Sequence, residues 1–315
     1  MAVSVVLGGA GFLGSHLCEA LLRDHHHVIA IDDLSSGKIS NFKDFSANSK
    51  FTFQEQSICQ SIDLDQDIDY VFNFASPASP PHYLNHPIHT LQTGSIGTQN
   101  AIELALRKNA RLIQASTSEV YGDPAEHPQR ESYWGNVNPI GDRSCYDEAK
   151  RFSEALCMAY KRTRDLNLGI VRIFNTYGPR LDVYDGRVVS NFVNQALRND
   201  PITVYGSGQQ TRSFCYVSDL IDGILKLALA GDSVVGPMNI GNPNEFTVFE
   251  LAQLVIEKTQ SKSEIVFRDL PSDDPQRRCP DISLATELLQ WQPKVTLEEG
   301  IQHVIDWYSG EGATT

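Results

Sequence analysis

Several features are missing from this chain of 315 residues, and each absence removes a class of protein. The sequence holds no apolar run of the roughly 18 residues that a membrane-spanning helix needs. Basic side chains are scarce, because 26 lysines and arginines stand against 39 acidic residues and give a formal net charge of −13. Such a charge argues against nucleic acid or an anionic membrane surface as a partner. A bound anion therefore needs a local group of basic residues.

The six cysteines lack the CxxC spacing of zinc sites and redox pairs, so we predict reduced thiols and no metal site. Reduced thiols favour the cytosol. The first strand is expected to begin at Val3, which leaves no room for a signal peptide, and we therefore expect a cytoplasmic protein. A chain of this length can bury a substantial core without metals or disulfides.

Apolar runs of strand length alternate with longer stretches of helical period, which predicts an α/β fold with a doubly wound, Rossmann-type parallel sheet. The expected strands are Val3–Leu7, Val28–Ile31, Phe51–Gln54, Tyr70–Phe74, Arg111–Ala115, Gly169–Ile173 and Pro237–Ile240. The expected helices lie near Gly14–Asp24, Thr90–Lys108, Asp147–Asp165 and Phe246–Thr259. The alternation weakens after about Asn175. We therefore expect a cofactor-binding domain over 1–174, which the chain re-enters around 235–260, and a smaller C-terminal substrate-binding lobe formed mainly by 175–315.

A glycine-rich turn follows the first strand, with Gly8, Gly11 and Gly14 spaced as GxxGxxG before a helical stretch. Residues without Cβ allow backbone N–H groups and a helix N-terminus to approach a pyrophosphate. The second strand ends at Asp32 and Asp33, where a carboxylate can accept hydrogen bonds from an adenosine ribose and repel a 2′-phosphate. The pattern predicts a dinucleotide site and favours NAD over NADP.

Tyr146 and Lys150 stand four residues apart, hence on one face of a helix. A nearby cation stabilises a phenolate, so we expect Lys150 to lower the tyrosine pKa and prepare it for proton transfer at a sugar hydroxyl. Thr117 and Glu119 follow a strand about 30 residues earlier, and ligands of open α/β sheets bind beyond the C-terminal ends of strands. These four residues are the candidate catalytic group.

The sequence resembles the extended short-chain dehydrogenases/reductases, the NAD-dependent epimerase/dehydratase family, from about Val3 to Trp307. Within that family it is most similar to the UDP-glucuronate decarboxylases, also called UDP-xylose synthases. The segments that carry the resemblance are GGAGFLGSHL (Gly8–Leu17), ASPASPPHY (Ala75–Tyr83), STSEVYGDP (Ser116–Pro124), YWGNVNPIG (Tyr133–Gly141), CYDEAKR (Cys145–Arg151), RIFNTYGPR (Arg172–Arg180), DGRVVSNF (Asp185–Phe192) and VYGSGQQTRSF (Val204–Phe214). The second and fourth segments resemble the decarboxylases and are unlike most sugar epimerases.

The resemblance implies a role for each matching position. It makes Tyr146 the catalytic base with Lys150 beneath it, Thr117 its hydroxyl partner, and Glu119 and Arg278 further catalytic residues. The implied substrate-binding residues are Asn175, Arg187, Tyr205, Arg212 and Arg278. The expected NAD-binding residues are Gly8, Gly11, Phe12, Leu13, Gly14, Asp32, Asp33, Ser36, Gly37, Ser57, Ile58, Phe74, Ser76, Thr93, Ser116, Tyr146 and Lys150. Arginines suit an acidic protein that binds a diphosphate and a carboxylate, because their fork matches both groups.

Three positions depart from the resembled pattern. Leu7 stands where threonine is usual before the double glycine, and Ser57 stands where an acidic residue commonly meets the adenine. Both changes concern the cofactor site. Cys279 replaces a lysine that often follows the late arginine. Arg111 lies at a strand edge outside every motif, and we expect Arg111→Ala, unlike Arg278→Ala, not to lose most of the activity.

The implied activity is oxidation of UDP-glucuronate at C4 by NAD, loss of CO2 from the 4-keto acid, and return of the hydride to give UDP-xylose. Release of the 4-keto pentose stays open. Three alternatives remain: a dTDP-glucose 4,6-dehydratase, a nucleotide-sugar 4-epimerase, and a non-catalytic NAD-sensing protein. The resemblance also implies a homodimer formed by the helices near Thr90–Lys108 and Asp147–Asp165, to which Leu156, Ala159 and Tyr160 could contribute.

Overall fold

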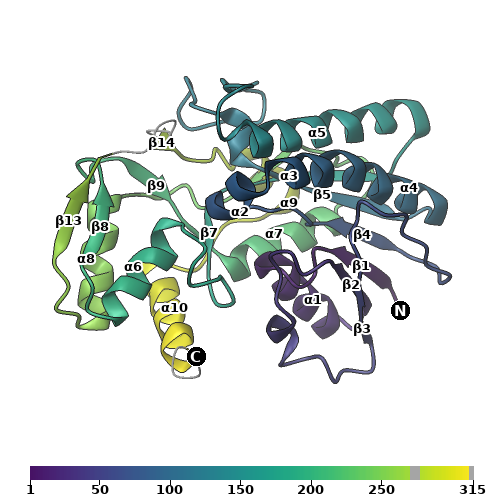
Figure 1. Cartoon of the computed structure of the whole chain (residues 1–315). Coiled ribbons are helices and arrows are strands. Elements are labelled where there is room, and N and C mark those ends of the chain that lie inside the picture. The colour runs from purple at the N-terminus through teal and green to yellow at the C-terminus, as the bar shows by residue number, and fades with distance from the viewer. Residues whose placement is uncertain (270–276, 312–315) are drawn as a thin grey trace.

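The computed structural model describes residues 1–269 and 277–311, and its centre is a parallel sheet between two helical layers (Figure 1). Seven parallel strands follow the order β11-β6-β5-β4-β1-β2-β3. They are β1 (Val3–Leu7), β2 (His27–Asp32), β3 (Phe51–Glu55), β4 (Tyr70–Asn73), β5 (Arg111–Thr117), β6 (Leu168–Ile173) and β11 (Met238–Ile240). Each agrees with a predicted strand to within one or two residues at either end, which confirms the α/β fold class.

Helices cover both faces of this sheet. They are α1 (Phe12–Arg23), α2 (Pro80–Asn85), α3 (Pro87–Gln92), α4 (Thr98–Lys108), α5 (Ser144–Arg164), α7 (Val217–Leu229) and α9 (Ser283–Leu289), with short turns η1 (Ile39–Phe42), η2 (Thr93–Gly97) and η3 (Ser118–Tyr121). Val6 and Ala30 pack in a core with α1, α7 and α9. Their neighbours Val5 and Ile29 pack in the opposite core with α4 and α5. Burial on both faces explains why these strands read as almost continuous apolar runs.

The remaining elements form a smaller lobe beside the C-terminal ends of the strands (Figure 1). They are β7 (Thr176–Tyr177), α6 (Val188–Leu197), β8 (Ile202–Tyr205), β9 (Thr211–Ser213), β10 (Cys215–Tyr216), β12 (Glu245–Thr247), α8 (Val248–Thr259), β13 (Ile265–Arg268), β14 (Arg277–Arg278) and α10 (Leu297–Glu311). A separate core joins α6, α8 and α10. No described helix has the length and apolar character needed to cross a membrane.

The chain returns from this lobe to the large sheet through α7 and β11. β11 pairs with β6, and α7 packs against α1, whereas α8 packs against α6 and α10. The first returning segment therefore spans 217–240, and α9 returns a second time to pack against α7 and β11. The helix predicted at Phe246–Thr259 lies in the smaller lobe. We retain a division near residue 174 as our proposal for the domain boundary.

The helix predicted over Thr90–Lys108 is confirmed, and a π-helical turn, η2, joins α3 to α4 within it, with right-handed helical backbone angles at both junctions. Gly94 in this turn lies against α5, where an added Cβ would stand 2.6 Å from the Cβ of Ala149. Ala149 precedes Lys150, so the turn brings the chain against the helix that carries the catalytic candidates. The absence of a side chain at Gly94 thus lets the π-helical turn approach α5 closely.

Candidate active site

The glycine-rich turn forms a cradle between β1 and α1. Gly8 has a φ of +79°, and a Cβ there would lie 2.6 Å from the backbone nitrogen of Ala75. A Cβ on Gly14 would overlap the Gly8 carbonyl oxygen. Gly11 begins α1 without a side-chain cap, and Phe12 lines the cavity with the rest of the first turn. Uncapped N–H groups at a helix start suit a diphosphate, so this cradle fits the pyrophosphate of NAD.

Asp32 stands beside the cradle at the end of β2. Its carboxylate accepts hydrogen bonds from the backbone nitrogens of Ala10 (3.0 Å) and Leu34 (2.8 Å). Burial raises its pKa, and these two bonds oppose the rise. Asp32 and Asp33 line a small cavity of about 60 Å³ beside the main one. Two carboxylates at this point suit a ribose with free hydroxyls better than a ribose phosphate.

Most of the predicted cofactor residues line these two adjoining cavities. They are Gly8, Gly11, Phe12, Leu13, Gly14, Asp32, Asp33, Ser36, Ile58, Phe74, Ser76, Thr93, Ser116, Tyr146 and Lys150. Gly37 and Ser57 do not. Gly37 packs under the turn, where an added Cβ would stand 2.8 Å from that of Ala10. The Ser57 hydroxyl accepts a bond from the Cys59 nitrogen at 3.4 Å, and Gln56 lines the small cavity in its place.

The main cavity, about 660 Å³ in volume, brings together all five predicted catalytic residues. Thr117 ends β5, Glu119 follows in η3, and Tyr146 and Lys150 lie in the first two turns of α5. Tyr146 shares a hydrogen bond with Thr117. Lys150 donates to the Ala115 carbonyl at 3.0 Å and lies 5.9 Å from the centre of the Tyr146 ring. The geometry suits proton transfer at a hydroxyl placed between Tyr146 and Thr117.

The expected lowering of the tyrosine pKa by Lys150 is wrong for the polypeptide itself. Burial raises the pKa of Tyr146 to about 12, and the Thr117 hydroxyl only partly offsets this. Burial also lowers the pKa of Lys150 to about 8. The physical reason is that both groups are desolvated, and desolvation disfavours the charged form of each. The Tyr146 side chain is therefore a neutral phenol in the polypeptide, and the charged protein groups around it do not convert it to a phenolate.

Glu119 is clamped by two arginines. Arg143 donates to its Oε2 at 2.7 Å, and Arg278 donates to its Oε1. This double ion pair outweighs the effect of burial and lowers the pKa of Glu119 to about 2. Asp147, nearby on α5, has a pKa raised to about 7 by burial and by the Glu119 charge. While Asp147 is protonated, the two arginines and the ionised Glu119 leave one net positive charge at this end of the cavity, and ionisation of Asp147 reduces that charge.

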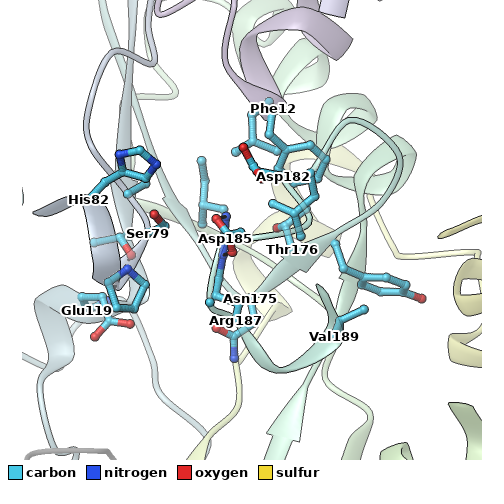
Figure 2. A pocket seen from close by; sticks show the side chains of 18 of the residues that line it. Phe12, Ser79, His82, Glu119, Asn175, Thr176, Asp182, Asp185, Arg187 and Val189 are labelled. Carbon is cyan, nitrogen blue, oxygen red and sulfur yellow. Dashed lines mark hydrogen bonds and ion pairs between the residues drawn. The ribbon is translucent and has the colours of Figure 1, made fainter. Parts of the chain in front are cut away.

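The predicted substrate residues line the same cavity. Asn175, Arg187, Tyr205, Arg212 and Arg278 are all among its walls. Figure 2 shows Asn175 and Arg187 opposite Glu119. Arg187 holds Asp185 through two hydrogen bonds, and it begins α6 with an extended backbone. Arg212 and Arg278 are register partners on β9 and β14. The smaller lobe thus supplies the basic residues that an anionic ligand needs in an acidic protein.

Three side chains that sequence reasoning missed belong to the site. Arg143 is the second partner of Glu119, Asp185 binds Arg187, and Tyr83 stacks on Tyr146 with ring centres 5.2 Å apart. Tyr83 and Asp185 stand inside quoted motifs, which held a signal for both. Arg143 lies outside the motifs, two residues before CYDEAKR, and no sequence pattern marked it.

Buried polar atoms point to the same cavity. The Ser79 hydroxyl, the Tyr83 hydroxyl and Arg278 Nε have no hydrogen-bond partner in the described part of the chain, and all three residues line its wall. A buried polar atom without a partner is costly, so such atoms mark positions where a polar ligand would be bound. Ser79 and His82 enter from the α2 side in Figure 2.

Arg111, chosen from the sequence as a control for activity, has a buried side chain with several hydrogen-bond partners. It is 4% exposed at the start of β5 and donates hydrogen bonds to Asn167 Oδ1 (2.6 Å) and to the carbonyls of Leu227 (3.2 Å) and Val234 (2.8 Å). Replacing Arg111 would leave the oxygen atoms of Asn167, Leu227 and Val234 without this hydrogen-bond donor in the interior, which lowers stability. Arg277, exposed beside Arg278, is the better control.

Comparison with known proteins identifies the family of this chain. Residues 4–241 match the model of the NAD dependent epimerase/dehydratase family. The chain belongs to this family. Family members close in sequence include UDP-glucuronic acid decarboxylase 1 of Arabidopsis thaliana, 50% identical over 301 residues that cover 96% of this chain and 68% of that protein. UDP-glucuronic acid decarboxylase 1 of Danio rerio is 48% identical over 98% of this chain and 72% of that protein.

Solved structures of the family share the whole architecture. A UDP-glucose 4-epimerase of Thermotoga maritima superposes with a TM-score of 0.88 at 30% identity, over 98% of this chain and 99% of that one. A UDP-glucuronic acid 4-epimerase of Bacillus cereus, in complex with UDP-glucuronic acid and NAD, gives 0.86 at 29% identity over the same shares. The family is NAD-dependent, which confirms the predicted cofactor.

Proposed function

We propose that this protein decarboxylates UDP-glucuronate to UDP-xylose, with NAD as a tightly bound cofactor. The observation that carries the proposal is the surplus positive charge formed by Arg143 and Arg278 around Glu119. A hexuronate brings one carboxylate, which this surplus can hold bidentately. Relatives of about 50% identity over nearly the whole chain are UDP-glucuronic acid decarboxylases. Arg187, Arg212 and Tyr205 would contact the nucleotide diphosphate part.

The first step is oxidation at C4 of the sugar. The Gly8–Gly14 cradle and Asp32 would hold NAD, which would supply the acceptor for the C4 hydride and the source for its return. Tyr146 takes the proton of the C4 hydroxyl, and Thr117, already hydrogen-bonded to Tyr146, holds that hydroxyl in line. The Tyr146 pKa is about 12 in the polypeptide, so Tyr146 is a neutral phenol there. It can accept the hydroxyl proton only as a phenolate, which requires positive charge beside the ring once the ligands are bound.

The second step is loss of CO2. A ketone at C4 makes the C5 carboxylate a β-keto acid, so the bonding electrons pass into an enolate as CO2 leaves. Arg278 lies buried next to Glu119, close enough to hold the carboxylate and then the developing charge. Glu119 stays ionised and orients both arginines. Protonation at C5 and return of the hydride to C4 complete the balance and give the pentose.

Two alternatives within the family fit the site less well. A 4,6-dehydratase usually carries an Asp-Glu pair where this chain has Ser118 and Glu119, and a serine cannot supply the acid for dehydration. A 4-epimerase usually lacks an acidic residue at the position of Glu119. The third alternative, a non-catalytic NAD sensor, does not explain why Thr117, Tyr146 and Lys150 meet in one buried group.

The test is turnover of several nucleotide sugars with added NAD+. We expect CO2 and a UDP-pentose from UDP-glucuronate, and neither CO2 nor a 4-keto-6-deoxy sugar from UDP-glucose or dTDP-glucose. UDP-galacturonate as the product would identify a 4-epimerase, and dehydration of dTDP-glucose would identify a dehydratase. Binding of NAD without turnover of any of these sugars would support the sensor. Each of these three results would contradict decarboxylation.

We also propose a homodimer in the cytoplasm. The helices α2 to α5 carry exposed apolar side chains, among them Leu84, Ile88, Leu91, Ile96 and Phe152. A two-fold contact would bury the same patch on both subunits. Leu156 and Tyr160 already pack in part against the core of their own subunit, so they would contribute less to that contact than predicted. Six free thiols accord with a reducing compartment.

A further inference from the structure

Three metal-ligating side chains meet outside the cavity. His127, Glu245 and Cys279 each offer one ligand atom, and these atoms all lie within 4.8 Å of one another. His127 Nε2 and Glu245 Oε2 are 3.0 Å apart. The residues come from the loop after η3, from β12 and from the end of β14, so more than 30 residues separate each from the next. Because its members are far apart in the sequence, no short spacing motif predicts this three-ligand cluster.

The surrounding hydrogen bonds fix the three ligands. Glu245 Oε1 accepts from the Thr211 hydroxyl at 2.6 Å, which leaves Oε2 directed at His127. The Cys279 backbone donates to Gln129 Oε1 at 2.9 Å, and Gln129 donates back to the Cys279 carbonyl at 2.9 Å. Supporting contacts of this kind orient metal ligands in established sites. The thiol is buried, whereas the imidazole and carboxylate remain open to solvent, which gives an ion a path of entry.

We propose that His127, Glu245 and Cys279 bind a Zn²⁺ ion, with a water molecule as the fourth ligand. One sulfur, one imidazole nitrogen and one carboxylate oxygen suit a borderline-soft ion and not Mg²⁺ or Ca²⁺. Tetrahedral zinc places neighbouring N and O ligands about 3.3 Å apart and S and N ligands about 3.6 Å apart. Zinc would therefore widen the 3.0 Å separation of His127 and Glu245 slightly and would draw the more distant ligand atoms, which now lie within 4.8 Å, closer by up to about 1.2 Å. The Cys279 thiol, which now donates to the Pro243 carbonyl at 3.3 Å, would lose its proton to solvent.

The site would join two parts of the chain that frame the cavity. Cys279 directly follows Arg278, and His127 follows η3, which carries Glu119. Glu245 belongs to the three-stranded sheet β12-β9-β14 that holds Arg212 and Arg278. Bound zinc would thus fasten the strand of Arg278 to the loop beyond Glu119. This inference does not depend on the sugar that the enzyme converts.

Cobalt(II) gives a direct readout of the thiolate. Added to the purified full-length protein in a reducing, phosphine-containing buffer, Co²⁺ should produce the near-ultraviolet charge-transfer band of a cobalt–thiolate bond, at about one ion per chain. Cys279→Ser should abolish the band. Cys59→Ser, which removes a partly exposed thiol outside the cluster, should keep it. A band that is absent from the parent protein, or that persists in Cys279→Ser, would overturn the proposal.

Zinc binding tests the other two ligands. In competition with a chromophoric chelator, His127→Asn and Glu245→Gln should each weaken Zn²⁺ binding at least tenfold, because both keep the size of the side chain but lose a good ligand atom. A hundredfold excess of Zn²⁺ over its Kd should raise the melting temperature of the parent by about 3–6 °C and leave that of Cys279→Ser unchanged. Equal zinc affinity in the parent and both variants would contradict the proposal, and His127 and Glu245 would then form only an ordinary ion pair.

Discussion

Arg143 donates a 2.7 Å hydrogen bond to Glu119, and it does so from the residue immediately before α5, the helix that carries Tyr146. The start of the catalytic helix is therefore tied to the carboxylate that also holds Arg278. Both side chains are largely buried, so the pair is little screened by solvent. Replacing Arg143 should therefore act mainly on the ionisation of Glu119.

Arg143→Gln should raise the pKa of Glu119 from about 2, because one of its two cationic partners is lost. Glu119 is ionised above its pKa, so the variant should lose activity as the pH falls through the raised value, where the parent still works. The measurement is kcat/KM for CO2 release between pH 4.5 and 8. Arg130→Gln, at an exposed arginine, is the control. Identical acid limbs in the parent and Arg143→Gln would contradict this role.

Arg278→Ala should lose most decarboxylation, since the substrate carboxylate or the developing charge would then be buried without a partner, at a cost of roughly 2–5 kcal/mol. That corresponds to about 30-fold to several-thousand-fold in kcat/KM. Arg277→Ala removes the same side chain one residue away, at an exposed position, and should behave like the parent. The idea fails if both variants lose activity equally.

Tyr146→Phe should reduce kcat by at least 100-fold, because it removes the only hydroxyl that Thr117 places for proton transfer and leaves the packing volume almost unchanged. NAD affinity, followed by calorimetry, should stay within about twofold, since the cradle does not involve that hydroxyl. Stacking on Tyr83 should survive as well. Activity within tenfold of the parent would remove Tyr146 from its role as the base.

Asp147→Asn should stabilise the protein at neutral and alkaline pH. The folded pKa of Asp147 is about 7, above the 3.8 of an ordinary aspartate, so the folded state binds more protons than the unfolded state between these values. The parent therefore loses stability as the pH rises from about 4 to about 7, by on the order of 1–3 kcal/mol. Melting temperatures at pH 5 and pH 8 should show the advantage of the variant only at pH 8. An equal advantage at both would refute the assignment.

Charge placed on the α2 to α5 surface should separate the proposed homodimer. Ile88 is 71% exposed and Phe152 is 48% exposed, and a charge buried at either position in an apolar interface is costly. Light scattering at micromolar concentration should show a dimer for the parent and a monomer for Ile88→Asp or Phe152→Asp. Ile39→Asp, on η1 outside this surface, should remain dimeric. A monomeric parent would rule out the interface.

Local sequence determined the elements of the sheet and the cofactor cradle. The seven strands were predictable because burial on both faces requires unbroken apolar runs of strand length. Gly8 and Gly14 were recognisable because a turn that admits no Cβ restricts the residue type within a few positions. The helical period placed Tyr146 and Lys150 on one face of α5, and the strand-end segment that holds Thr117 and Glu119, together with the family resemblance, indicated their role. In each case the constraint acts over a short stretch of chain.

Tertiary structure alone decided the charges and the contacts between distant segments. The pKa of Tyr146 rises because the folded chain removes water from the ring, an effect that no spacing encodes. Arg143 and Arg278 are 135 positions apart and meet only at Glu119. His127, Glu245 and Cys279 come together through the pairing of β12, β9 and β14. Desolvation and long-range pairing depend on the whole fold, so sequence patterns do not reveal them.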